Sequence, residues 1–74
     1  MLEEIKVRIE REIPESEAIP YTADNHHFEV QVISEAFEGK SLLARHRMVY
    51  DALGDLMQEI HALAMDTKTP GESK

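Results

Sequence analysis

The sequence contains no cysteine among its 74 residues. The chain therefore forms no internal disulfide bond and supplies no thiolate metal ligand of its own. The absence of cysteine also fits a reducing compartment. No apolar run approaches the roughly 18 residues that a membrane-spanning helix needs, and the acidic start Met-Leu-Glu-Glu is unlike the basic start of a signal peptide. We therefore expect a cytoplasmic protein that does not enter a membrane.

Basic residues are scarce. The chain carries 8 Lys and Arg against 15 Asp and Glu, which gives a net charge of -7. This charge disfavours binding to nucleic acid or to an anionic membrane. Only Lys40, Arg45 and Arg47 form a basic group, and two roles stay open for it. The group contacts an anionic partner, or it is a solvated helix face on which Arg47 pairs with Asp51.

The chain is also short. A domain of this size buries only about 60% of the surface that its unfolded form exposes, which leaves little room for an enzyme cleft. No Ser-His-Asp set and no paired carboxylates stand out in the sequence. We therefore expect a single domain over residues 1–74, with a loose tail over 70–74. Its expected role is binding, delivery or regulation, and we do not expect an enzyme.

Hydrophobic periodicity predicts the elements of the first half. Apolar residues at helical spacing predict a helix over residues 1–12, which Pro14 ends. A short strand is expected over 18–22, with Pro20 at a sheet edge because proline cannot donate to a ladder. Strict alternation predicts a strand over 27–34, and the turn residues 23–25 make the two strands a hairpin.

The second half is expected to be a turn, a helix and a strand. Residues 35–40 form the turn, and Ser41 can cap the helix that follows. Gly54 interrupts this helix at a cost of roughly 1 kcal/mol relative to Ala. A final strand over 61–68 should lie parallel to the strand over 27–34. One apolar helix face is predicted to carry Leu42, His46, Val49, Leu53, Leu56 and Ile60.

Four short motifs occur together in the order that identifies a family. They are Phe37-x-Gly39, Arg45-His46-Arg47-x-Val49-Tyr50, Ile60-His61-Ala62-Leu63 and Thr67-Lys68-Thr69-Pro70. With this order and spacing the chain resembles the BolA family. The resemblance implies an α+β fold in the order α-β-β-α-β, similar to class II KH folds. Helices would cover a three-stranded mixed sheet.

The resemblance also implies a partner and a cofactor. BolA-like proteins pair with monothiol glutaredoxins and can share a [2Fe-2S] cluster with them, with glutathione taking part. Their role is iron-sulfur trafficking or iron-linked regulation, and no cluster is expected to bind stably to this chain alone. The family's C-terminal histidine ligand matches His61. A second ligand comes from the loop between the first two strands, which here offers His26 and His27.

The predicted topology is consistent with these ligands. If the last strand runs parallel to the second, then His61 and the pair His26–His27 lie at the same end of the sheet. Adjacent side chains of a strand point to opposite faces, so at most one of His26 and His27 joins His61. The freedom of the loop favours His26, with His27 as the alternative. His46 is instead expected in the core, bonded to a backbone carbonyl.

An alternative function is a DNA-binding transcriptional regulator, in line with the family's other description. It would use Lys40, Arg45 and Arg47, against the net charge of the chain. The oligomeric state, including a homodimer, is left open by the sequence.

Overall fold

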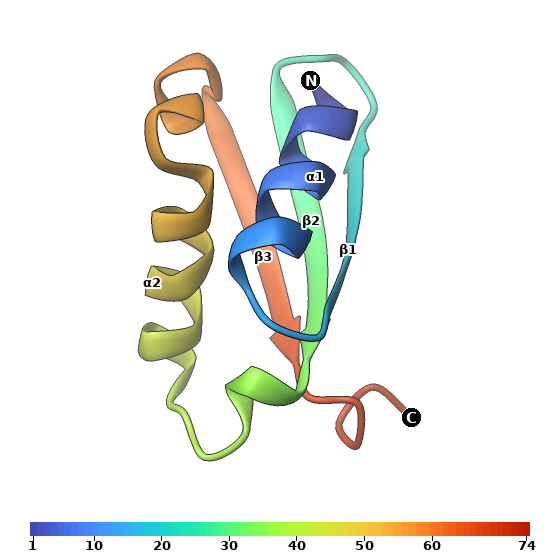
Figure 1. The fold of residues 1–74 in the computed structure, drawn as a ribbon. Helices are drawn as coiled ribbons and strands as arrows, with labels where there is room; N and C mark the ends of the chain where they lie inside the picture. The colour runs from blue at the N-terminus through green and yellow to red at the C-terminus, as the bar shows by residue number, and fades with distance from the viewer.

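The computed structural model describes residues 1–74 as an α+β fold (Figure 1). Two helices and three strands follow in the predicted order. Neither helix is long and apolar enough to cross a membrane. The elements are α1 (Leu2–Glu12), β1 (Ser16–Thr22), β2 (His27–Ser34), α2 (Leu42–Leu53) and β3 (Ala62–Lys68), with the short 3-10 helices η1 (Glu35–Phe37) before α2 and η2 (Gly54–Glu59) after it.

The sheet has the order β1-β2-β3. Strand β1 is antiparallel to β2, whereas β2 and β3 are parallel, as predicted from the helical crossover between them. Pro20 lies on the edge strand β1 and pairs with Val30 of β2. Because β1 has a neighbour on one side only, the missing N–H of Pro20 costs the ladder little. The parallel pairing brings the starts of β2 and β3 to one end of the sheet.

The core lies between the two helices and one face of the sheet. Alternation along β2 buries Phe28, Val30 and Val32 and leaves Glu29 exposed, so the second face of the sheet remains open to solvent. Helix α1 contributes isoleucines four residues apart, which lie on one face of a helix. The buried apolar residues are Ile5, Ile9, Ile13, Ala18, Phe28, Val30, Val32, Phe37, Val49, Ala52, Leu53, Leu56 and Ile60.

Helix α2 begins at Leu42 behind its Ser41 cap, as predicted, but its C-terminal end and the burial of Leu42 differ from the prediction. It ends at Leu53, because Gly54 takes a backbone conformation with φ of 54° that continues as the 3-10 helix η2. Leu56 and Ile60 remain buried beyond this break. At the other end, the prediction for Leu42 is wrong, since its side chain is 62% exposed. Phe37, which is fully buried, fills the core there instead.

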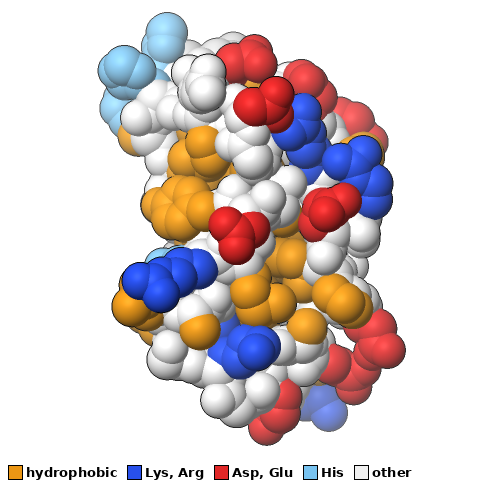
Figure 2. All heavy atoms as spheres, turned by 60° about the vertical axis from the view of Figure 1, so that its left-hand side comes forward, with side chains coloured by type: hydrophobic (Ala, Val, Ile, Leu, Met, Phe, Trp, Pro, Cys, Tyr) orange, Lys and Arg blue, Asp and Glu red, His pale blue; other side chains and the backbone are white.

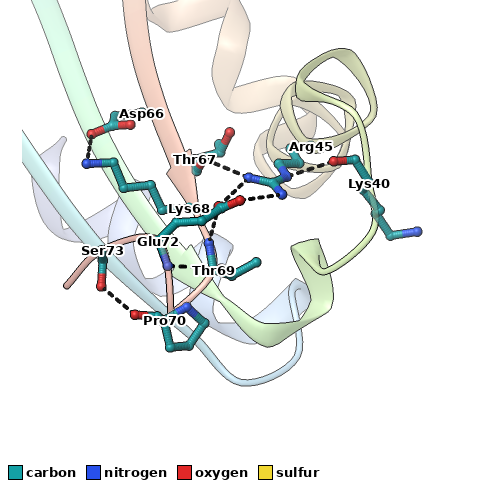
Figure 3. Close-up of polar contacts among 9 residues, drawn as sticks. All are labelled: Lys40, Arg45, Asp66, Thr67, Lys68, Thr69, Pro70, Glu72 and Ser73. Atoms are coloured by element: carbon teal, nitrogen blue, oxygen red, sulfur yellow. Dashed lines mark hydrogen bonds and ion pairs between the residues drawn. The ribbon is translucent and has the colours of Figure 1, made fainter.

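The C-terminal residues were expected to be loose, and this expectation is wrong for Glu72. Thr69 and Glu72 form a capping box. The N–H of Thr69 donates to Oε1 of Glu72 (2.8 Å) and the N–H of Glu72 donates to Oγ1 of Thr69 (3.2 Å). The same carboxylate accepts two hydrogen bonds from Arg45 of α2 (Figure 3). The turn that follows β3 is therefore attached to α2.

Candidate functional site

Three of the four histidines lie where β2 and β3 begin. In the parallel register His27 of β2 pairs with Ala62 of β3. His26 directly precedes His27, and His61 directly precedes Ala62. The β1–β2 turn and the connection from η2 into β3 lie at the same end of the fold (Figure 1). Figure 2 shows histidine side chains gathered at that end of the molecule.

The turn before β2 is organised by Asp24. Oδ1 of Asp24 accepts hydrogen bonds from the backbone N–H groups of His26 and His27, both at 2.9 Å. Oδ2 lies 2.9 Å from Nδ1 of His27. These contacts hold the pKa of the Asp24 carboxyl well below its usual range, first through the backbone and the ring of His27 and then through the backbone of His26.

Side chains on either side of Asp24 complete the turn. Oγ1 of Thr22 donates to the carbonyl of His27 (2.7 Å) and accepts from the N–H of Asn25 (3.0 Å). Asn25 has φ of 64°, a left-handed conformation that asparagine tolerates better than most residues. The backbone that carries His26 and His27 is therefore held by hydrogen bonds of the turn itself.

His61 lies in the bend that leads into β3, and its side chain is exposed. The preceding residue, Ile60, is buried and caps η2, which fixes the backbone at this point. The rings of His61 and His26 make no hydrogen bond or ion pair within the chain. Both rings are therefore free to bind an external group.

The donor set of the site is imidazole nitrogen. No group of three or more histidine, aspartate or glutamate side chains is placed to hold a metal ion. Exposed imidazoles with free nitrogen suit an iron centre of the kind in which two histidines ligate one iron of a [2Fe-2S] cluster. The chain thus offers exposed imidazole nitrogen at this end of the fold and no complete set of metal ligands of its own.

His46 lies outside this site. Helix α2 starts at the opposite end of the fold from the β1–β2 turn, and His46 is in its first half (Figure 1). His46 is half-buried and is not part of the buried core in which it was expected. The expected hydrogen bond to a backbone carbonyl is absent. The Nε2 atom of His46 is buried and has no partner in the chain.

The basic group divides into two parts. The Arg45 side chain is only 12% exposed, and its guanidinium binds Glu72 and the carbonyls of Lys40 and Thr67, while it lies 5.8 Å from the Phe37 ring centroid. Arg45 is thus a structural residue and is not free for contact with an anionic partner, one of the two roles left open for the basic group. Lys40 and Arg47 are exposed, and the pair of Arg47 with Asp51, which belonged to the other role, is not formed.

The contacts of two residues, Asp24 and Glu72, were not predicted. Asp24 precedes the two histidines at the spacing of an Asx turn, a pattern that the sequence contains. Glu72 stands three residues after Thr69, with proline at the first position between them, which is the pattern of a capped helical turn. Both patterns are readable in the sequence, but their contacts with His27 and Arg45 are not.

A family model matches this chain over almost its whole length, and known proteins match a large part of it. The family model described as BolA-like protein matches residues 2–72. Protein BOLA2 of Arabidopsis thaliana is 58% identical over 48 residues, which cover 64% of this chain and 52% of that protein. The SufE-like protein 1 of Arabidopsis thaliana is 51% identical over 47 residues, which cover 62% of this chain and 13% of that protein. The match thus spans about half of the first relative and much less of the second.

A solved structure shares the fold closely. The bolA protein homologue from Coxiella burnetii superimposes with a TM-score of 0.85 at 47% identity. The superposition covers 99% of this chain and 95% of that chain. The arrangement of helices and strands described above is therefore the one found in that homologue.

Proposed function

The chain belongs to the BolA-like protein family, and on this premise we propose that it binds a [2Fe-2S] cluster shared with a monothiol glutaredoxin. In this proposal His61 supplies one nitrogen ligand and His26 or His27 supplies the other. The partner's cysteine and its bound glutathione complete the cluster's ligands. The cluster is cargo for iron-sulfur trafficking or iron-linked regulation.

The observation that carries the proposal is the parallel pairing of β2 with β3. Because His27 pairs with Ala62, the loop histidines and His61 enter neighbouring strands side by side. Adjacent strands lie about 4.8 Å apart, which is within reach of two imidazoles that bind one iron. The two-histidine donor set also explains why a partner is needed, since two nitrogen atoms do not complete the ligands of a cluster.

We propose no catalytic activity for the chain itself. Its site contains exposed imidazoles and no nucleophile paired with a base, so it can hold and release a ligand. A related domain, the BolA domain of SufE1 from Arabidopsis thaliana, occurs within a larger protein, which fits a module that works together with others. The cytoplasmic location stays a prediction.

The alternative of a DNA-binding regulator has less support. With Arg45 bound to Glu72, only Lys40 and Arg47 of the basic group remain free on a chain of net charge -7. Two free cations release few counterions on binding DNA, so they contribute little affinity at physiological salt. The contact of Lys40 and Arg47 with a protein partner stays a prediction. Lys40 precedes α2, whose 12 residues span about 18 Å, and Arg47 lies near the middle of this helix, whereas His61 follows its far end.

Anaerobic reconstitution with a purified monothiol glutaredoxin tests the proposal. The visible absorption and circular dichroism of the mixture should differ from those of the glutaredoxin alone. The His61→Ala variant should lose this difference, because it removes one of the two nitrogen ligands. Gln58→Ala, an exposed change in η2 close to the site in sequence, serves as the matched control and should behave as the wild type. A heterocomplex spectrum that His61→Ala leaves unchanged would remove His61 from the ligand set.

A further inference from the structure

The Asp24 carboxylate links the backbone of the β1–β2 turn to the ring of one histidine. Its Oδ1 is bound by the N–H groups of His26 and His27, and its Oδ2 lies 2.9 Å from Nδ1 of His27. An ionised carboxylate only accepts hydrogen bonds, so Nδ1 of His27 must carry the hydrogen. The lone pair of a neutral His27 ring is then on Nε2, the nitrogen that points away from Asp24.

We propose that Asp24 is a positioning residue that selects His27, and not His26, as the loop ligand by holding its ring as the Nδ1–H tautomer. This inference rests on the proposed function for the role of the ligand, although the tautomer itself is a property of the chain alone. A carboxylate that accepts from the second ring nitrogen is a common partner of metal-binding histidines, where it fixes ring orientation and raises ligand basicity.

The two loop histidines differ in how firmly they are held. His27 is the first residue of β2, so its backbone is fixed by the ladder with β3, and Asp24 restrains its ring. His26 lies in the turn, and only its backbone N–H is bound. A ligand that is already oriented loses less conformational entropy when it binds a metal. This difference favours His27.

The neighbour of His27 across the ladder leaves room beside it. Directly paired residues project on the same face of a sheet, and the partner of His27 is Ala62, whose side chain is a single methyl group. The residue before Ala62 is His61. His61 lies in a bend outside β3, so the alternation of the strand does not set the direction of its side chain, and the small Ala62 leaves the space beside His27 open.

The Asp24→Asn variant separates positioning from folding. The amide oxygen of asparagine can still accept from the two backbone N–H groups, so the turn is kept. Its NH₂ group then faces Nδ1 of His27 and donates to it, which places the ring hydrogen on Nε2. Exchange of an orienting aspartate for asparagine produces the wrong histidine tautomer in the same way in catalytic triads. Glu29→Gln, an exposed acid-to-amide change on β2, is the matched control for charge.

The first measurement uses the chain without any metal. Long-range ¹H–¹⁵N spectra of the ¹⁵N-labelled protein at neutral pH report which ring nitrogen of each histidine is protonated. His27 should show a protonated Nδ1 in the wild type and in Glu29→Gln, and a protonated Nε2 in Asp24→Asn. Backbone amide shifts of the turn check that the variant remains folded. A wild-type His27 ring protonated on Nε2 would overturn the inference, whatever the cluster experiment gives.

The second measurement uses Zn²⁺ as a probe of the nitrogen pair. In the wild type, added Zn²⁺ should shift the Nε2 signal of His27 together with the ring signals of His61, and should leave His26 unchanged. The Asp24→Asn variant should bind Zn²⁺ roughly tenfold or more weakly, as expected for loss of an orienting carboxylate. Zinc-dependent shifts at His26 in place of His27 would overturn the inference. If His27 and His61 respond while no cluster forms with a glutaredoxin, the positioning role stands and the proposed function fails.

Discussion

Arg45 and Glu72 form a two-pronged ion pair between α2 and the turn after β3. Nη1 of Arg45 lies 2.7 Å from Oε1 of Glu72, and Nη2 lies 3.2 Å from Oε2. The same guanidinium donates to the carbonyls of Lys40 and Thr67, so one side chain joins three segments of the chain. This geometry makes Arg45 a structural residue.

Removal of Arg45 should destabilise the fold. Arg45→Ala leaves Glu72 without its partner and the carbonyls of Lys40 and Thr67 without their donor, so the melting temperature should fall. Arg47→Ala, the matched control on the same helix, should change stability by no more than about 0.5 kcal/mol because its side chain is exposed and unpaired. Thermal unfolding followed by circular dichroism compares the two. Equal melting temperatures for the two variants would contradict the structural role of Arg45.

Acid should remove the contribution of Glu72. The hydrogen bonds from Arg45, followed by those from Thr69, lower the pKa of the Glu72 carboxyl from 4.5 to about 2. A carboxyl whose pKa is lowered by folding stabilises the folded state above its unfolded pKa, and this contribution disappears as the pH falls through the folded pKa. The stability difference between wild type and Glu72→Gln should therefore be constant above about pH 5.5 and shrink between pH 4.5 and 2. Urea titrations across this range measure it, and a difference that does not change with pH would contradict the assignment.

Replacement by alanine should affect the stability of the fold differently at Gly54 and at Gly71. Gly54 has φ of 54°, where a side chain is strained, and its added Cβ would meet only Arg8 Nη1 at 3.8 Å. Gly54→Ala should therefore cost about 1–3 kcal/mol through backbone strain and not through a clash. Gly71 lacks a positive φ and has space for a methyl group, so Gly71→Ala should be neutral or slightly stabilising. Chemical denaturation of both variants checks this, and equal losses would show that backbone conformation at Gly54 is not the cause.

The core near the start of α2 depends on Phe37. Its side chain is fully buried, and Phe37→Ala should cost about 3–5 kcal/mol through lost burial and the cavity that remains. A domain of this size is stable by only about 5 kcal/mol, so this variant should be largely unfolded at 37 °C. The milder Ile9→Val, at another fully buried position, should cost about 0.5–1.5 kcal/mol and remain folded. If Phe37→Ala unfolds cooperatively with a midpoint near that of the wild type, then the neighbouring side chains fill the cavity and the predicted loss of stability is wrong.

The periodicity of apolar residues predicts a helix or strand correctly where one face of that element packs on the core. The alternation of Phe28, Val30 and Val32 predicts β2 with its observed bounds, because the period of a strand is two. The apolar pattern over α2 predicts too long a helix, since Leu56 and Ile60 continue the apolar face after Gly54 has ended the helix. A 3-10 helix that packs on the same core has an apolar spacing close to that of an α-helix, so the sequence pattern alone does not distinguish the two.

The order of the elements and their buried faces follow from local features of the chain. Side-chain spacing, proline and turn residues act within a few positions, so they can be read without knowing the neighbours. Pairwise contacts are different. Asp24 beside the ring of His27, His61 beside the start of β2 and Arg45 against Glu72 depend on the register of the strands and on where α2 ends. These placements are decided by packing across the whole domain, which brings His26 and His61, 35 positions apart in the chain, to the same end of the sheet.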